Sequence, residues 1–153
     1  MAVIIRPAEE KDVSHIVRLT KELAEYENMS QFCTITEEMF SKLLFEEHSL
    51  NALVAENDGA VIGIASYYFY KISTFSGKKV LYLEDLYIIP EARGMGTGRK
   101  FFDELKKIAK NSGCGKIQWK CLKWNEPSLA FYDKIGGIRD DEWITYDIPN
   151  NDF

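Results

Sequence analysis

Three stretches of the chain combine residue types and spacings that could carry out chemistry. Residues 91–100 read EARGMGTGRK, with three alternating glycines, and Glu84 and Asp85 interrupt the apolar run LYLEDLYI. Tyr132 lies in the run AFYDKIGG. Glycine-rich loops can bring backbone amides close to phosphate oxygens. A strand carboxylate can accept a proton, and a tyrosine with a pKa near ~10 can donate one at neutral pH.

The glycine loop follows a strand-like run and precedes a helical pattern. The first amides of a helix have no partner within the helix, so this order favours a phosphate ligand, although a ligand-free glycine turn explains it equally well. The Walker pattern needs Gly-Lys-Ser/Thr, which this loop lacks. Gly94, Gly96 and Gly98 give G-x-G-x-G, whereas the dinucleotide fingerprint is G-x-G-x-x-G. These comparisons exclude the usual nucleotide loops.

The carboxylate pair and the tyrosine each have a structural alternative. Strict alternation along a strand predicts that Glu84 and Asp85 face opposite sides of the sheet, so at least one faces the protein interior or a cleft. Such a position is costly unless the carboxylate has a partner, so a salt bridge or an edge position would also explain it. Tyr132 is one of eight tyrosines and could be an ordinary packing residue.

The elements that must position these residues are predicted from periodicity and turn residues. Strands are predicted at 3–7, 80–88, 116–122 and 142–148, with a hairpin at 51–71 that turns at Asp58-Gly59. Helices are predicted at 10–27, 34–47, 97–111 and 125–135. Thr34 and Glu37 form a capping-box pattern for the second helix. The helical crossover from 80–88 to 116–122 predicts a parallel pair beside the antiparallel hairpin.

Composition narrows the class of protein. A chain of 153 residues with 46% apolar residues suits one α/β domain, residues 1–153. The net charge of −5 argues against a nucleic-acid partner, and no apolar run is long enough to cross a membrane. The first residues do not resemble a signal peptide, so a cytoplasmic location is expected. Three cysteines without a C-x-x-C pair, and two distant histidines, predict reduced thiols and no metal site.

Three blocks resemble one known family. Residues 93–98 match the Q/R-x-x-G-x-G/A motif of the GCN5-related N-acetyltransferase (GNAT) superfamily. IRPAEEKD, YLEDLYIIPEARGMGTG and WNEPSLAFYDKIGG occur in the order seen in its spermidine/spermine, or diamine, acetyltransferase branch. The resemblance implies a GNAT fold: an α/β fold with a single mixed central sheet flanked by helices. Coenzyme A would bind where the strands splay, after the glycine loop.

The resemblance also implies acetyl-CoA as the cofactor, without a metal, and a set of residues that contact it. The backbone amides of the glycine loop would bind the pyrophosphate, and a bulged strand before the loop would aim an amide at the thioester oxygen. The implied coenzyme-binding residues are Leu86, Tyr87, Ile88, Arg93, Gly94, Met95, Gly96, Thr97, Gly98, Arg99, Asn125 and Tyr132. For Asn125, a plain helix N-cap is an equally good interpretation.

For the reaction, the resemblance implies direct attack of an amine on the thioester. Glu84 would take the amine proton through water, and Tyr132 would be the acid for the departing thiolate. The implied acceptor-binding residues are Tyr26, Glu27, Glu84, Asp85, Gln118, Trp119, Lys120 and Glu142. Homodimers are usual in this branch, so a homodimer is expected.

The identity of the acceptor amine is left open. Spaced carboxylates and aromatic rings suit a polyamine or diamine, but Lys120 and Lys123 stand where animal polyamine-acetylating relatives are apolar or acidic. These lysines would favour an acceptor with a carboxylate, such as thialysine. The alternatives are acetylation of a protein lysine or N-terminus and, in another class, a non-catalytic acyl-CoA-binding module.

Overall fold

The computed structural model describes residues 2–153, which fall into a first unit ending at Lys120 and a second unit, Cys121–Phe153. A mixed five-stranded sheet forms the centre of the first unit, in the order β1-β2-β3-β4-β5. The strands are β1 (Ile4–Pro7), β2 (Asn51–Asn57), β3 (Ala60–Tyr70), β4 (Val80–Ile88) and β5 (Lys116–Trp119). Only the β4–β5 pairing is parallel among these strands. The predicted mixed sheet is therefore confirmed, although β5 ends three residues earlier than expected.

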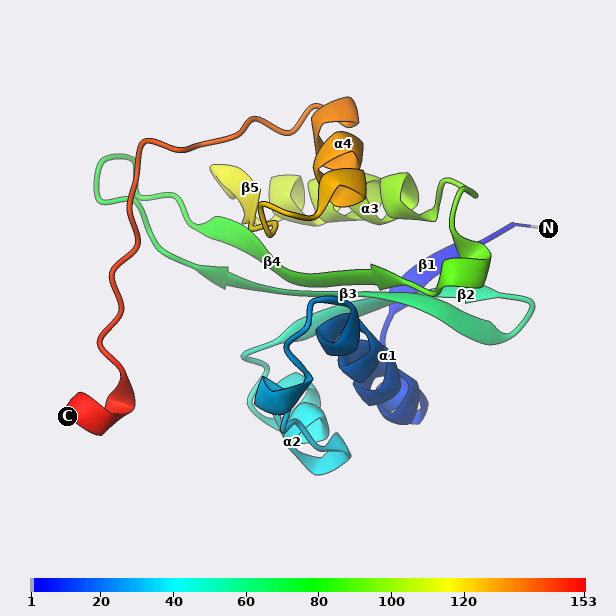
Figure 1. Cartoon of the computed structure of the whole chain (residues 1–153). Coiled ribbons are helices and arrows are strands. Elements are labelled where there is room, and N and C mark those ends of the chain that lie inside the picture. The colour runs from blue at the N-terminus through cyan, green and yellow to red at the C-terminus, as the bar shows by residue number, and fades with distance from the viewer. Residues whose placement is uncertain (1) are drawn as a thin grey trace. The chain divides into compact units, whose positions relative to one another are not determined.

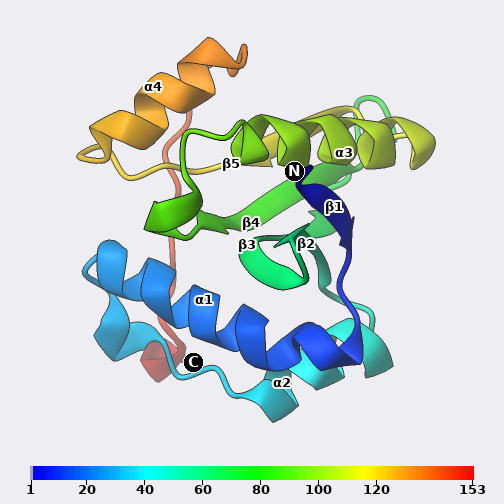
Figure 2. The ribbon, with the colours of Figure 1, turned by 90° about the vertical axis from the view of Figure 1, so that its right-hand side faces the viewer.

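Helices cover both faces of this sheet. Figures 1 and 2 show α1 (Val13–Tyr26) and α2 (Glu37–Ser41) on one face and α3 (Thr97–Asn111) on the other. The apolar stripe of α1 includes Ile16 and Leu19, which are fully buried in a cluster with Phe40 and Tyr87. On the other face, α3 buries Phe101, Phe102, Leu105 and Ala109. Burying each large side chain contributes roughly 1.5–3 kcal/mol, so these two stripes hold the layers together.

The second predicted helix begins later than the sequence pattern indicates. The N-cap of α2 is Thr36, whose hydroxyl accepts a hydrogen bond from the amide of Met39 at 3.2 Å. The predicted capping box from Thr34 to Glu37 is therefore wrong, because Ile35 packs against the apolar cluster and the helix starts only after it. α2 then continues as a π-helical segment, Lys42–Glu46.

The backbone geometry of the β2–β3 hairpin turn is the one that its two residues favour. Asp58 and Gly59 have φ values of 51° and 81°, as a two-residue hairpin turn with positive φ at both positions requires. The first predicted helix begins with a 3-10 turn, Glu10–Asp12, and continues as α1.

The ladder between β3 and β4 contains a β-bulge. Ser66 pairs with Asp85, but the next residue, Tyr67, pairs with Leu83. Glu84 is therefore an extra residue in β4 without a counterpart in β3. Such a bulge interrupts the alternation of side chains along the strand.

The second unit contains α4 (Glu126–Lys134). The side chain of Asn125 caps this helix by accepting a hydrogen bond from the amide of Ser128 at 3.5 Å. The strand predicted at 142–148 is wrong, because residues 142–148 are irregular in the structure. A strand needs a neighbour to exchange backbone hydrogen bonds, and the described residues of this unit include no other strand.

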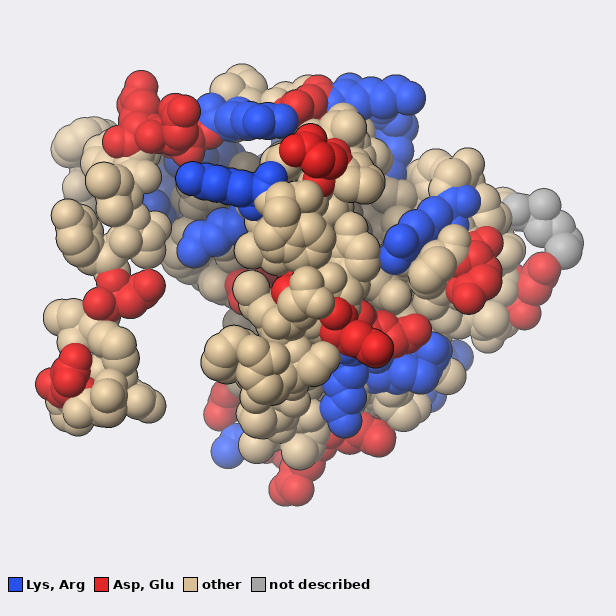
Figure 3. Space-filling model, in the orientation of Figure 1, with Lys and Arg blue, Asp and Glu red and all other residues tan. Residues whose placement is uncertain are grey.

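The described helices include none that is both long and apolar enough to span a bilayer. Acidic and basic side chains are interspersed over the visible face of the α1–α2 layer (Figure 3). This visible face does not present the continuous positively charged stripe that is typical of a nucleic-acid-binding surface.

Candidate active site

The bulge in β4 turns Glu84 and Asp85 toward the same face of the sheet. Ser66 and Tyr68 share a face of β3, and each donates a hydrogen bond to one of the carboxylates. The Ser66 hydroxyl lies 3.2 Å from Oδ2 of Asp85, and the Tyr68 hydroxyl lies 3.1 Å from Oε2 of Glu84. Asp85 also lines a pocket with Thr20 of α1, which identifies the face as the one that α1 and α2 cover. The prediction that Glu84 and Asp85 face opposite sides of the sheet is therefore wrong, because the extra residue in β4 interrupts the alternation of side chains.

Asp85 is the more buried carboxylate of the pair. Burial, together with the negative charges of Glu84 and Glu27, raises the pKa of Asp85 to about 6, although the hydrogen bond from Ser66 opposes the rise. A carboxylate in this state is ionised at neutral pH but gains strongly from a nearby cation. The electrostatics therefore favour binding of an ammonium group at Asp85.

Glu84 is exposed and lies beside a cluster of tyrosines on the same face. The ring centroids of Tyr68 and Tyr70 lie 5.5 Å and 5.0 Å from that of Tyr82. Burial, followed by the charge of Glu84, raises the pKa values of Tyr68 and Tyr82 to about 12. Both hydroxyls therefore stay protonated, and that of Tyr68 can hold Glu84 in place. Sequence analysis missed this cluster, although the alternating tyrosines of YYFY on β3 were a usable signal.

Two further residues predicted to bind the acceptor lie in this region of the first unit. Gln118 on β5 accepts a hydrogen bond from the Tyr70 hydroxyl at 2.9 Å, which connects it to the tyrosine cluster. Glu27, the C-cap residue that follows α1, is partly desolvated, which raises its pKa, and its charge acts on Asp85. The structure thus brings Glu27, Glu84 and Asp85 together as a locally acidic site.

The remaining predicted acceptor residues are placed differently. The ring of Trp119 packs edge to face on Phe102 of α3, at 4.9 Å between centroids. Lys120 is exposed just after β5, and Tyr26 lies under the guanidinium of Arg93, 5.8 Å from its ring centre. Glu142 lies in the second unit and is exposed. Their roles in acceptor binding stay predictions.

The glycine loop offers open space and unpaired groups at the start of α3. Gly94 and Gly96 have φ values of 80° and 78°, a conformation that favours glycine, and a Cβ at either position would meet no atom within 4 Å. Gly96 caps α3 without a side chain, so the first amides of the helix lack a side-chain partner. The hydroxyl of Thr97 is buried with no hydrogen-bond partner. These donors fit a ligand rich in acceptor oxygens, as a phosphate group is.

Arg93 ties the loop to the end of β4. Its Nε donates to the carbonyl of Ile88 at 2.9 Å, and its guanidinium lies 5.5 Å from the ring centre of Tyr87. The side chain is therefore engaged within the protein, which supports the interpretation that backbone amides are the main phosphate donors. Met95 and Arg99 are exposed.

The two coenzyme-contacting residues predicted from the WNEPSLAFY block belong to α4. Asn125 is 6% exposed and caps the helix, so its structural role is confirmed, while coenzyme contact stays a prediction. Tyr132 lies two turns further along α4, with its ring 5.5 Å from that of Phe131. The assignment of Tyr132 as the acid is likewise a prediction.

The described residues contain no group of three His, Cys, Asp or Glu side chains that could hold a metal ion. Cys33, Cys114 and Cys121 are not joined in disulfides in the structure.

Known proteins share both the sequence pattern and the fold. Residues 16–137 match the Acetyltransferase (GNAT) family. The thialysine N-epsilon-acetyltransferase of Bos taurus is 37% identical over 143 residues, covering 88% of this chain and 83% of that protein. Spermidine/spermine N(1)-acetyltransferase-like protein 1 of Homo sapiens is 34% identical over 88% of this chain but only 20% of its own length. An integron cassette protein from V. cholerae has a TM-score of 0.81 at 24% identity, covering 99% of this chain and 95% of that one.

These matches agree with the mixed sheet, the bulged strand and the amide-rich loop. The relatives are named N-acetyltransferases, so the alternative of a non-catalytic binding module is not supported. The match extends over most of the chain and includes both the carboxylate pair and the glycine loop. The chain therefore belongs to the Acetyltransferase (GNAT) family and is an acyltransferase of the N-acetyltransferase type.

Proposed function

We propose that the protein transfers the acetyl group of acetyl-CoA to a primary amine of a small molecule by direct attack. The observation that carries this proposal is the gathering of Glu27, Glu84 and Asp85 on one face, at the bulged strand that leads to the glycine loop. Acidic side chains at this point suit a cationic acceptor. The names of the curated relatives support an amine acceptor.

The residues at the start of α3 fit the pyrophosphate of coenzyme A. The amides of Gly94 to Arg99 and the unpartnered hydroxyl of Thr97 would donate hydrogen bonds to its oxygens. Leu86, Tyr87 and Ile88 of β4 would lie along the thioester, with a backbone amide as the donor to the acetyl oxygen. When bound, acetyl-CoA supplies an activated acetyl group.

The side chains then divide the proton transfers. Glu84, held by Tyr68 and open to solvent, accepts the proton of the acceptor ammonium through a water molecule. Asp85 stabilises the positive charge of the amine before that proton leaves. Tyr132 donates a proton to the departing sulfur.

The acceptor that fits best is an amino acid of the thialysine type. Lys120 and Lys123 would pair with the carboxylate of such an acceptor. The same two cations would repel a tri- or tetra-amine. Diamines are the second candidate, because Glu27 provides an additional acid near Asp85. Acetylation of a protein lysine or N-terminus is a third. The homodimer and the cytoplasmic location stay predictions.

A thiol-release assay with acetyl-CoA tests the proposal. The acceptors are thialysine, lysine, putrescine, spermidine and a lysine-containing peptide, with a reaction lacking acceptor as the control for hydrolysis. We expect the highest kcat/KM with thialysine. Preference for the peptide would favour protein acetylation, and thiol release independent of every amine would contradict N-acetyl transfer.

Coenzyme A binding is tested separately by thermal unfolding. At a hundredfold excess over Kd, a ligand stabilises the folded state by about 2.7 kcal/mol, which raises the Tm of a chain this size by roughly 5–10 °C. An unchanged Tm at millimolar coenzyme A would contradict the assignment of the glycine loop.

A further inference from the structure

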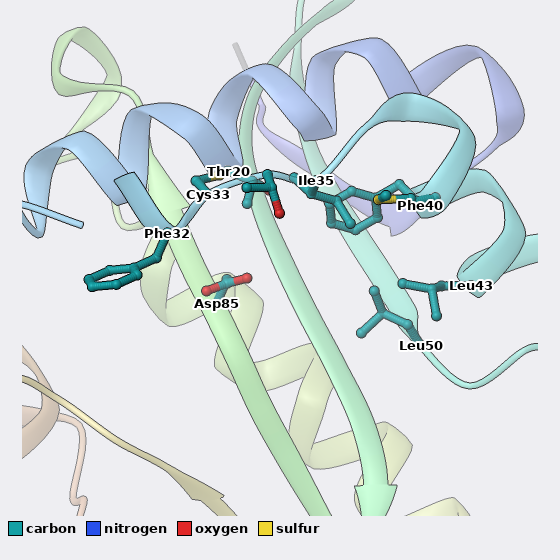
Figure 4. A pocket seen from close by; sticks show the side chains of 10 residues that line it. Thr20, Phe32, Cys33, Ile35, Phe40, Leu43, Leu50 and Asp85 are labelled. Atoms are coloured by element: carbon teal, nitrogen blue, oxygen red, sulfur yellow. The ribbon is translucent and has the colours of Figure 1, made fainter. Parts of the chain in front are cut away.

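An apolar pocket opens beside Asp85, between the sheet and the segment that includes α2 (Figure 4). Its volume is about 330 Å³, within the range of small-molecule sites. Its lining consists of Thr20, Phe32, Cys33, Thr34, Ile35, Met39, Phe40, Leu43, Leu50 and Asp85. Asp85 is the one charged member of this lining. The pocket therefore combines a single carboxylate with aliphatic and aromatic walls.

The carboxylate of Asp85 is the group in the pocket that favours binding of a cation. The carboxylate of Asp85 uses Oδ2 to accept a hydrogen bond from Ser66 and, once ionised, can only accept further bonds. The hydroxyl of Thr20 already donates to the carbonyl of Ile16 at 2.8 Å. Figure 4 shows Leu43 and Leu50 at the end of the pocket away from Asp85. A ligand that fits this arrangement has one ammonium group and an apolar chain.

A second charge on the ligand would be unfavourable in this pocket. An ammonium group placed among Phe40, Leu43 and Leu50 would lose its hydration without gaining a partner. A methylene group in the same place would gain binding, by about fourfold in affinity per group at ordinary hydrophobic transfer energies. The pocket should therefore distinguish a monoamine from a diamine of equal length.

We propose that this pocket binds the aliphatic chain of primary monoamines, with their ammonium group at Asp85, and that such amines are a further class of acceptor. In the reaction the ammonium group gives one proton to Glu84 through water, the amine nitrogen forms a bond to the acetyl carbon, and the carbon–sulfur bond of the thioester breaks. The nitrogen then loses a second proton and the released thiolate gains one, so the products are the N-acetylamine and the free thiol. This inference rests on the proposed N-acetyl transfer and extends it to acceptors without a second charge.

A homologous series of acceptors tests the proposal. We expect kcat/KM to rise about fourfold per methylene from butylamine through pentylamine to hexylamine. Hexylamine should also exceed 1,6-diaminohexane, because the second ammonium cannot enter the apolar end. A flat series, or a preference for the diamine, would overturn the proposal.

A pair of variants at Met39 tests the pocket itself. Met39 is half exposed on α2, so substitution there should leave the fold intact. Met39→Glu places a second carboxylate in the lining, and Met39→Gln has the same size without the charge. Relative to Met39→Gln, we expect Met39→Glu to raise the ratio of kcat/KM for 1,6-diaminohexane to that for hexylamine by at least about tenfold. An equal ratio in the two variants would place the acceptor chain elsewhere.

These results separate the inference from the proposed function. If thialysine is acetylated and the alkylamines are not, the monoamine proposal is wrong and the function stands. If no amine is acetylated, the proposed function is wrong. Calorimetric binding of hexylamine, weakened in Met39→Glu but not in Met39→Gln, would still support the pocket in that case, and absence of binding would overturn it.

Discussion

Replacing Asp85 with asparagine should stabilise the protein while removing its activity. The folded environment raises the pKa of Asp85 from 3.8 to about 6, chiefly through burial and also through the charges of Glu84 and Glu27. An ionised carboxylate at this position therefore costs free energy of folding. The amide side chain of the Asp85→Asn variant would carry no charge and would keep an oxygen that can accept the hydrogen bond from Ser66.

The size and pH range of the effect follow from these two pKa values. A difference of about 2 corresponds to about 3 kcal/mol, at 1.36 kcal/mol per pKa unit. Because the folded state binds the Asp85 proton more tightly, the contribution of Asp85 to stability is highest below pH 3.8 and falls as pH rises to about 6. At pH 7.5 Asp85→Asn should therefore be more stable than the wild type by about 3 kcal/mol, or roughly 6–12 °C in Tm.

Urea unfolding of both proteins at several pH values measures this difference. The gap should be largest at pH 7.5 and should close as pH is lowered toward 4. The exposed Asp103 on α3 provides a matched control, since Asp103→Asn should change stability by less than about 0.5 kcal/mol at every pH. An Asp85→Asn variant that is less stable than the wild type, or a gap that does not depend on pH, would refute the reasoning. Activity should be lost because the neutral amide cannot pair with the acceptor ammonium.

Three further variants test individual residues. Glu84→Gln should lower kcat by about 10²–10⁴-fold or move the pH optimum upward, and an unaltered pH–rate profile would remove Glu84 as the base. Tyr132→Phe should lower turnover far more than the affinity for coenzyme A, measured by calorimetry; equal losses in both would indicate a binding role. Arg6→Met should cost about 3–5 kcal/mol at neutral pH, because it leaves the buried Asp12 without the guanidinium that lies 2.7 Å away. Burial opposes the ionisation of Asp12, but hydrogen bonds from Arg6 hold its pKa below the ordinary value, so this loss should shrink as pH falls below about 4, and a loss independent of pH would contradict the pairing.

Much of the fold could be predicted because local residues determine it. Asp58-Gly59 suits the one turn geometry that a two-residue hairpin needs, and the apolar stripe of 97–111 specifies a helix before any packing is considered. The predicted strand at 142–148 failed for the opposite reason. Its alternating residues Ile144, Tyr146 and Ile148 are typical of a strand, but this segment has no partner strand in its own unit. Strand pairing depends on a second segment, which a local pattern does not contain.

The candidate site was predictable in its residue types but not in its geometry. Glu84 and Asp85 stood out because acidic residues interrupt an apolar strand, and the resemblance to the GNAT superfamily implied their roles. Their shared orientation depends on a register shift against β3, which only the pairing of two strands can reveal. The pocket beside Asp85 was not predicted, because Phe40, Leu43 and Leu50 cannot be distinguished from ordinary core residues by sequence alone.

The bulge also divides β4 into two segments with different reading frames. Before it, the even-numbered Tyr82 shares the α1–α2 face, and after it the odd-numbered Asp85 and Tyr87 do. A library that randomises every second residue of β4 to alter acceptor choice would therefore change the wrong face in half of the strand. Between Ser66 and Tyr70, β3 keeps one frame through Ser66, Tyr68 and Tyr70, so a regular library confined to this stretch would vary only the acceptor side. Nearer its start, β3 has an extra residue of its own, Ile62, against β2.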